Sequence, residues 1–204
     1  MNKKISLFYK IGRVILGCIF KIYYNPKIIN KEYIPTDGPI IIAGNHMHLY
    51  DQFLTIIATK RGIHYMAKKE YFDSKKTAWF FKAAGCIRVD RTKKDPEAVN
   101  NALNVLFDGG AIGIFPEGTR NKTDAFLLPF KFGAVSIAKK SNALIVPFGI
   151  TGDYKFRSKN LTIRYGKPFK VGNMTLEKAN EKLYKEVEKL MKQNLSEKWA
   201  ITFF

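Results

Sequence analysis

The sequence predicts an α/β fold in which a mostly parallel central sheet lies between layers of helices. Short apolar segments alternate along the chain with stretches of helical periodicity, and several of these segments are hydrophobic on both faces. A strand that is apolar on both faces is typical of a parallel sheet covered by helices on each side. At 204 residues and without an internal repeat, the chain has the length of one ordinary domain.

Each predicted element follows from a local pattern. Short apolar segments bounded by polar or turn residues predict six strands, at residues 39–43, 63–67, 86–89, 111–115, 143–150 and 161–165. The stretches between them predict helices at residues 51–60, 75–83, 96–107 and 132–140. A last helix is predicted at residues 176–195, where Thr175 suits the N-cap and one stripe is apolar, namely Leu176, Ala179, Leu183, Val187 and Leu190.

Residues 6–24 predict an amphipathic helix. Its narrow polar stripe holds Lys10, Arg13, Gly17 and Lys21, and a broad apolar face holds Leu7, Phe8, Ile11, Val14, Ile15, Cys18, Ile19 and Ile22. The longest charge-free run, residues 14–20, is too short to span a bilayer, and the segment lacks the features of a cleaved secretory signal.

We therefore expect residues 1–25 to form a membrane-associated segment, with the apolar face in the bilayer and the lysines toward lipid phosphates. The alternative is an ordinary helix docked on the folded domain of residues 26–204. A second apolar patch closes the chain, and it is either another membrane contact or a tail packed in a groove; it contains Trp199, Ala200, Ile201, Phe203 and Phe204.

The charge of the chain predicts an anionic partner. Lys and Arg number 35 against 17 Asp and Glu, which leaves a net charge of +18. Nucleic acid, an anionic membrane surface and a phosphorylated substrate all fit this charge, which does not choose between them.

The two cysteines, Cys18 and Cys86, form neither a disulfide framework nor a zinc-binding spacing, and this favours a reducing compartment.

The first polar motif follows the predicted strand at residues 39–43 and ends where a helix is expected to begin. His46 lies in this turn, and Asp51 comes five residues later. If the helix begins between them, Asp51 can accept a hydrogen bond from one ring nitrogen of His46 and leave the other nitrogen to act as a base. A helix cap is the alternative role for Asp51, because chance often supplies a His and an Asp at this spacing.

The second polar motif, residues 115–120, reads Phe-Pro-Glu-Gly-Thr-Arg and follows the predicted strand at residues 111–115. Its proline and glycine predict a sharp turn, from which Glu117 and Arg120 project polar groups. The backbone amides of Gly118 and Thr119 can face a phosphate or an oxyanion. The alternative is a surface turn with an ion pair.

The third polar motif, residues 85–91, places Arg88 and Arg91 at the end of another predicted strand. A guanidinium group suits bidentate binding of phosphate, although charges at a strand edge also keep a protein soluble.

The sequence contains no Gly-x-Ser-x-Gly motif, and neither cysteine has polar neighbours that would activate it. We therefore expect direct attack by a substrate hydroxyl rather than a covalent acyl-enzyme.

Together these motifs resemble those of the glycerolipid acyltransferase family. His46 and Asp51 match its His-x4-Asp signature, and residues 85–91, 115–120 and 146–147 match its other three blocks in the same order. The similarity covers residues 34–165, and the compact chain is most similar to the bacterial members that make phosphatidic acid from 1-acyl-sn-glycerol-3-phosphate. The resemblance implies an α/β sandwich with an acyl-chain tunnel, in which residues 26–204 form the acyltransferase domain.

The resemblance also implies a role for each matched residue. His46 would be the general base acting on the glycerol 2-hydroxyl, and Asp51 would orient it. Arg91 would hold the substrate phosphate. Arg88 is a second candidate, since this chain has an arginine at a position where the family more often has an apolar residue or proline. Binding of the acceptor would be completed by Glu117, Gly118, Thr119, Arg120 and Lys68.

The substrates and partners implied by the resemblance are lysophosphatidic acid and an acyl thioester of acyl-carrier protein or coenzyme A. No metal or other cofactor is expected, and neither is nucleic acid. The anionic membrane surface would be a further partner, which places the protein on the cytoplasmic face of the cell membrane as a peripheral or monotopic protein.

Two alternatives stay open at this point. The chain could be a member of the same superfamily that acylates glycerol-3-phosphate or another lysophospholipid, since the acceptor pocket decides between these. It could also be a non-catalytic module that binds anionic lipid or nucleic acid through its basic charge and its 14% aromatic residues. Asp51 and Glu117 place negative charge among the motif residues, and this charge would repel a polyanion such as nucleic acid.

Overall fold

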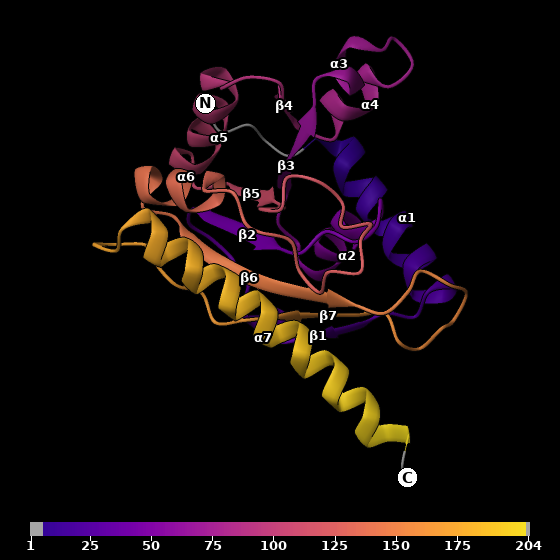
Figure 1. The fold of residues 1–204 in the computed structure, drawn as a ribbon. Coiled ribbons are helices and arrows are strands. Elements are labelled where there is room, and N and C mark those ends of the chain that lie inside the picture. The colour runs from indigo at the N-terminus through magenta and orange to yellow at the C-terminus, as the bar shows by residue number, and fades with distance from the viewer. Residues whose placement is uncertain (1–5, 203–204) are drawn as a thin grey trace.

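The computed structural model describes residues 6–202 and the side chains of residues 6–197. Figure 1 shows a central sheet with helices on both faces. The sheet has seven strands in the order β1-β7-β6-β2-β5-β3-β4, and the pair β6–β7 is antiparallel whereas the other neighbouring pairs are parallel. The predicted α/β class and the mostly parallel sheet are thus confirmed.

The strands are β1 (Lys27–Ile29), β2 (Ile40–Gly44), β3 (Ile63–Lys68), β4 (Ile87–Val89), β5 (Ala111–Ile114), β6 (Leu144–Thr151) and β7 (Thr162–Tyr165). Each of them except β1 lies close to the apolar segment that predicted it. Since β6, β2, β5, β3 and β4 are neighbours in parallel orientation, their carboxyl ends lie at one edge of the sheet.

The helices form one layer on each face of the sheet (Figure 1). One layer contains α1 (Leu7–Tyr23) and α2 (Asp51–Ala58), and the other contains α5 (Pro96–Phe107), α6 (Gly133–Ser141) and α7 (Leu176–Thr202). The short helices α3 (Glu70–Asp73) and α4 (Ala78–Ala83) lie together beside the first turns of α1, and a 3-10 turn, η1 (Lys31–Tyr33), precedes β2.

The burial of the central strand β2 on both faces explains why its sequence is apolar throughout. Its residues are fully buried, and successive side chains enter different hydrophobic cores. Ile40 and Ile42 pack in the core under α1 and α2, whereas Ile41 and Ala43 pack in the core under α5, α6 and α7. Burial on two faces is what distinguishes a central parallel strand from an amphipathic one.

The elements that sequence patterns missed are short. The edge strand β1 has three residues and pairs with β7 alone, and α3 has four residues. Neither is long enough to show a periodicity.

Helix α7 continues to Thr202, beyond the predicted end at residue 195. The apolar patch predicted at residues 199–204 lies outside the side chains that the structure describes.

Helix α1 packs on the domain through the side opposite to its broad apolar face. Tyr9 and Phe20 are buried beneath it, and the Tyr9 hydroxyl accepts a hydrogen bond from the backbone N–H of Ile63 at 3.0 Å. Within the polar stripe, Arg13 faces the domain, and its guanidinium donates to the carbonyl of Thr59 at 3.3 Å. Lys10 and Lys21 of the same stripe are exposed.

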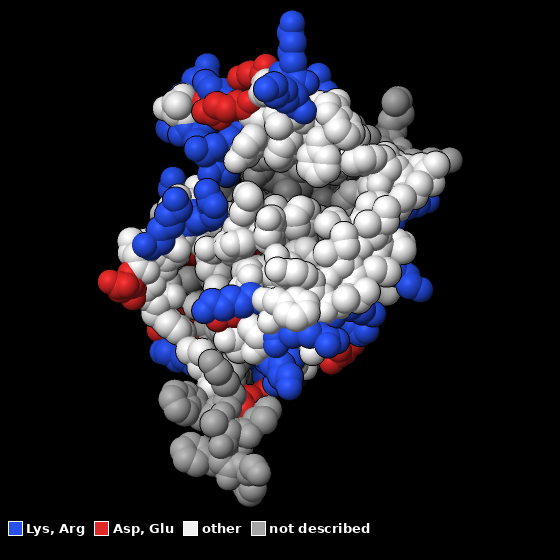
Figure 2. All heavy atoms as spheres, turned by 90° about the vertical axis from the view of Figure 1, so that its right-hand side faces the viewer, with Lys and Arg blue, Asp and Glu red and all other residues white. Residues whose placement is uncertain are grey.

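The broad apolar face of α1 is exposed and continues onto neighbouring segments. The Phe8 ring lies 5.8 Å from that of Trp79 on α4, and the Tyr23 ring lies 5.0 Å from that of Phe156 in the loop after β6. We call this surface the apolar face; its exposed members are Leu7, Phe8, Ile11, Val14, Ile15, Ile19, Ile22, Tyr23, Trp79, Phe80 and Phe156. Figure 2 shows this side of the molecule as a broad, largely uncharged surface with lysines and arginines, and fewer acidic residues, around its margin.

No helix within residues 6–202 is both long enough and apolar enough to cross a bilayer.

Candidate active site

The predicted motifs meet at the edge of the sheet where the parallel strands end. His46 follows β2, Phe115 follows β5, and Arg91 follows β4, while Lys68 is the last residue of β3. These residues are far apart in the sequence, and parallel pairing of their strands brings them to one side of the domain.

His46 and Asp51 form the contact that their spacing predicts. Nδ1 of His46 lies 2.8 Å from Oδ2 of Asp51, and the Asp51 side chain is fully buried whereas 16% of the His46 side chain is exposed. An ionised carboxylate can only accept, so Nδ1 carries the proton and the lone pair lies on Nε2. Nε2 has no hydrogen-bond partner among residues 6–197 and is available as a base.

Four donors surround the Asp51 carboxylate. Besides the His46 ring, Oδ2 accepts from the backbone N–H groups of Met47 at 2.7 Å and His48 at 2.8 Å, and Oδ1 accepts from the Tyr154 hydroxyl at 2.7 Å. Asp51 is also the first residue of α2, where a helix N-terminus favours negative charge. The carboxylate therefore orders the turn before α2 and orients the histidine at the same time.

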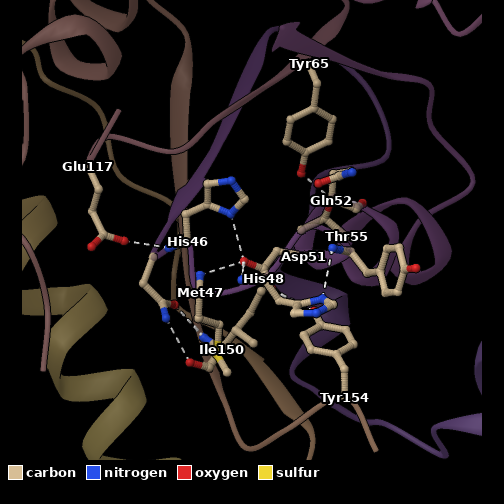
Figure 3. Close-up of polar contacts among 12 residues, drawn as sticks. His46, Met47, His48, Asp51, Gln52, Thr55, Tyr65, Glu117, Ile150 and Tyr154 are labelled. Atoms are coloured by element: carbon tan, nitrogen blue, oxygen red, sulfur yellow. Dashed lines mark hydrogen bonds and ion pairs between the residues drawn. The ribbon is translucent and has the colours of Figure 1, made fainter. Parts of the chain in front are cut away.

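The second motif holds His46 in place from the other side. Oε1 of Glu117 accepts the backbone N–H of His46 at 2.6 Å, and the backbone N–H of Asn121 donates to the carbonyl of His46 at 2.7 Å. The His46 ring stacks on that of Phe115, with 4.0 Å between centroids and 13° between planes. The backbone and the ring of His46 are thus both fixed by residues 115–121, and Figure 3 shows Glu117 aimed at the backbone of His46.

Glu117 is enclosed, with only 4% of its surface exposed. Its Oε2 accepts the backbone N–H of Leu128 at 3.0 Å, so each carboxylate oxygen is bonded to the backbone. Burial raises the pKa of Glu117 above its ordinary value, opposed by the hydrogen bonds from His46 and Leu128. In this structure Glu117 links the turn after β2 to the loop before α6.

Of the candidate phosphate-binding residues outside the second motif, Arg91 contacts Gly118. Nη1 of Arg91 donates to the carbonyl of Gly118 at 2.9 Å, which brings the third motif to the second. Arg88 points elsewhere, with its Nη2 3.6 Å from Oδ1 of Asp73 on α3. The other candidates are exposed at the surface, namely Lys68, Thr119 and Arg120.

Gly118 adopts a left-handed conformation, with φ at +71°, which glycine tolerates best. A side chain there would also come within 3.0 Å of the Lys131 side chain. Lys131 is exposed, and its backbone N–H donates to the carbonyl of Pro116 at 2.9 Å. Arg91 and Lys131 therefore both lie against the turn at Gly118 and place positive charge beside it.

Sequence reasoning missed Asn45, Lys131 and Tyr154. Asn45 is buried and exchanges two hydrogen bonds with the backbone of Ile150, at 2.9 and 2.7 Å, which ties the end of β2 to β6. A polar residue at the end of an apolar strand was the signal for Asn45. For Lys131 and Tyr154 the sequence carried no comparable signal, since each reaches the site from a separate loop.

The structure also bears on covalent and metal chemistry. Burial raises the pKa of the Cys86 thiol to about 11, so that this thiol is protonated at neutral pH. Among the described residues, no group of three His, Cys, Asp or Glu side chains is placed to hold a metal ion.

Comparisons with known proteins identify the family. A family model described as Acyltransferase matches residues 25–151. The 1-acyl-sn-glycerol-3-phosphate acyltransferase of Bacillus subtilis (strain 168) is 32% identical over 187 residues, which cover 89% of this chain and 92% of that protein. The protein of the same name from Cocos nucifera is 33% identical over 182 residues, covering 83% of this chain and 58% of that protein.

A solved structure shares the fold. The crystal structure of the 1-acyl-sn-glycerophosphate acyltransferase of Thermotoga maritima superimposes with a TM-score of 0.74 at 21% identity, covering 91% of this chain and 80% of that one. The family model spans more than half of the present chain and includes both His46 and Asp51. The chain therefore belongs to the acyltransferase family.

Proposed function

We propose that the protein transfers an acyl chain from an acyl thioester to the 2-hydroxyl of 1-acyl-sn-glycerol-3-phosphate, which yields phosphatidic acid for phospholipid synthesis. The observation that carries the proposal is the His46–Asp51 pair, because Nε2 of His46 is free and the His46 backbone is held by Glu117 of the turn that Arg91 contacts. The names of the Bacillus subtilis and Cocos nucifera relatives support the choice of acceptor.

The chemistry follows from the orientation of His46. Nε2 removes the proton from the acceptor hydroxyl as its oxygen attacks the thioester carbonyl carbon, and Asp51 stabilises the imidazolium that forms. The tetrahedral oxyanion then collapses, the carbon–sulfur bond breaks, and the imidazolium returns the proton to the departing thiolate. This sequence is one direct displacement, and it consumes one thioester and one alcohol and releases one ester and one thiol.

The phosphate of the acceptor would be held at the turn after β5. Arg91 already bonds to the backbone of this turn, and Arg91 offers a planar guanidinium for bidentate binding. Gly118, Thr119 and Arg120 would complete this site, with Lys68 at the end of β3 and Arg88 further from it. Holding the phosphate fixes the distance from the glycerol 2-hydroxyl to the base, and positioning of this kind supplies a large part of catalysis.

The acyl donor would be a thioester of acyl-carrier protein or coenzyme A, and the proposed reaction requires no cofactor. Both donors are anionic, so the basic surface of the chain attracts either of them. The reaction uses no electron transfer, which leaves proton transfer and charge stabilisation as the tasks of the protein.

The apolar face would lie on the bilayer that contains the acceptor. It joins the outer side of α1 to Trp79, Phe80 and Phe156, and Lys10 and Lys21 border it. Apolar side chains with basic neighbours are typical of helices that lie in the headgroup region of anionic membranes. We place the protein at the cytoplasmic face of the cell membrane as a peripheral or monotopic protein.

The proposal is tested by identifying the product. The purified protein is incubated with an acyl thioester and either 1-acyl-sn-glycerol-3-phosphate or glycerol-3-phosphate, and the lipids are analysed by mass spectrometry. Phosphatidic acid formed from the first acceptor supports the proposal. Product from glycerol-3-phosphate alone would support the superfamily alternative, and no product with either acceptor would support a lipid-binding protein.

A further inference from the structure

Tyr154 reaches the active site from a loop that no motif indicated. The loop, residues 152–160, follows β6, and Tyr154 lies 103 positions from Asp51 in the sequence. Its hydroxyl donates to Oδ1 of Asp51 at 2.7 Å, whereas the His46 ring bonds to Oδ2 at 2.8 Å. The two oxygens of one carboxylate are therefore engaged by the base on one side and by Tyr154 on the other.

The loop is built to hold Tyr154 in this position. Gly152 has a φ of +92°, and a side chain there would come within 2.1 Å of the carbonyl oxygen of Asn160. The next residue, Asp153, donates its backbone N–H to Oδ1 of Asn160 at 3.1 Å, and its carbonyl accepts the Ser158 hydroxyl at 3.2 Å. These bonds close the loop on itself, so that Tyr154 is presented by an ordered turn.

Packing also fixes the ring of Tyr154. It stacks on the His48 ring with 4.3 Å between centroids, and it forms a T-shaped contact with the Tyr24 ring with 5.5 Å between centroids. Figure 3 shows the Tyr154 and His48 rings one against the other. Burial, followed by the charge of Asp51, raises the pKa of Tyr154 well above its ordinary value. The hydroxyl therefore keeps its proton and acts as a donor at every physiological pH.

We propose that Tyr154 is a positioning residue, which fixes the rotation of the Asp51 carboxylate and thereby the orientation of the His46 ring. The inference rests on the proposed function, because it assigns Tyr154 to the base of that reaction. Without this hydroxyl, Oδ1 of Asp51 would be a buried acceptor without a partner, and the rotation of the carboxylate would be held only by the three bonds to Oδ2.

The hydroxyl also affects the charge that faces His46. A donor on Oδ1 withdraws negative charge from the carboxylate, so its removal strengthens the attraction of Asp51 for a protonated imidazole. Of the titratable groups close by, Glu117, from the loop after β5, bonds to the His46 backbone, and His48, from the same turn as His46, stacks on Tyr154. Both are present in wild type and in a Tyr154→Phe variant, so a difference between the two proteins reports on the hydroxyl.

The test compares Tyr154→Phe with Tyr24→Phe. Tyr24 belongs to the same aromatic cluster, and its hydroxyl has no hydrogen bond among residues 6–197. We expect Tyr154→Phe to lower kcat about tenfold with KM for both substrates unchanged, and to shift the acid limb of the pH–rate profile to higher pH. Tyr24→Phe should leave kcat and the profile as in wild type. An unchanged kcat in a folded Tyr154→Phe variant would overturn the proposal.

A double-mutant cycle separates positioning from an independent role. In an Asp51→Asn background, Tyr154→Phe should have little further effect on kcat, because the carboxylate through which it acts is absent. The full effect of Tyr154→Phe in that background would refute the proposed route through Asp51.

An NMR titration of the His46 ring, assigned with His46→Gln, provides a readout that does not depend on activity. Its midpoint should be higher in Tyr154→Phe than in wild type, and an equal midpoint would contradict the inference. If wild type made no phosphatidic acid while the midpoint still shifted, the proposed function would fail and the positioning role would stand.

Discussion

The Glu117 carboxylate accepts the backbone N–H of His46 at 2.6 Å. This bond joins two motifs that lie 71 positions apart in the sequence, and it secures the backbone of the base rather than its ring. Because the other oxygen of Glu117 bonds to Leu128, the carboxylate also holds the loop that leads to α6. The position of His46 thus depends on a buried acid whose role in this structure is to hold the backbone.

The burial of Glu117 predicts a specific dependence of stability on pH. Since its pKa in the folded protein is raised above 4.5, the folded state keeps this proton after the unfolded state has lost it. The contribution of Glu117 to stability is therefore fully present below pH 4.5 and is lost as the pH rises through the raised pKa.

Urea unfolding of wild type and Glu117→Gln at pH 4.5 and pH 7 measures this effect. The free energy of unfolding of wild type minus that of Glu117→Gln should be larger at pH 4.5 than at pH 7. A relative stability that increases with pH would contradict the assignment.

Arg91 and Arg88 should differ in their effect on acceptor binding. Arg91 bonds to the turn at Gly118, whereas Arg88 lies near Asp73 on α3. Arg91→Ala should raise KM for the phosphorylated acceptor more than it lowers kcat, and Arg88→Ala should raise KM less. Steady-state kinetics with varied 1-acyl-sn-glycerol-3-phosphate provide the measurement, and an unchanged KM in Arg91→Ala would remove Arg91 as the phosphate anchor.

Gly44 at the end of β2 should not tolerate a side chain. A Cβ atom there would come within 2.2 Å of the carbonyl oxygen of Phe148 on the neighbouring strand β6. We expect Gly44→Ala to lower the free energy of unfolding by about 3 kcal/mol or more, because backbone must move to make room.

Gly12→Ala is the matched control for Gly44→Ala. It lies within α1, where nothing beyond its neighbours and the backbone of its own helix is within 4 Å of an added Cβ, and it should stabilise slightly through helix propensity. Thermal unfolding of both variants tests the pair, and similar melting temperatures for the two would show that β2 and β6 adapt more easily than their close approach implies.

The apolar face should control binding to membranes. Ile15 and Ile19 are exposed on the outer side of α1, at 54% and 49% of their surface. Replacing both with Glu should weaken binding to vesicles that contain anionic lipid by about tenfold or more, because two apolar side chains no longer enter the bilayer.

Phe107→Glu is the control for the membrane variant, since Phe107 is 66% exposed at the end of α5, in the helix layer opposite to α1. Vesicle sedimentation compares the two proteins with wild type. Equal binding of all three would show that the apolar face does not contact lipid.

The contacts that could be predicted from the sequence are local or lie at strand ends. His46 and Asp51 are five positions apart, so the start of a helix between them was enough to predict their contact. The apolar strands predicted a parallel sheet, and parallel pairing then places the polar motifs at one edge.

What the sequence could not show depends on long-range packing. The bonds from Tyr154 to Asp51 and from Asn45 to Ile150 join residues 103 and 105 positions apart. The inward orientation of Glu117 likewise depends on where Leu128 lies in the folded chain. The periodicity of α1 identified two faces, but only the folded domain shows that Arg13 bonds to Thr59 and that the broad apolar face is turned outward.

The most direct test of the central claim is the release of free thiol from an acyl thioester in the presence of 1-acyl-sn-glycerol-3-phosphate, with wild type beside His46→Ala. Acyl-carrier protein and coenzyme A thioesters are each supplied as the donor, and vesicle binding and the circular dichroism of the variant confirm that it is folded. We predict acceptor-dependent release by wild type and a loss of at least about a hundredfold in His46→Ala. Release that continues at the wild-type rate in His46→Ala would contradict the assignment of His46 as the base.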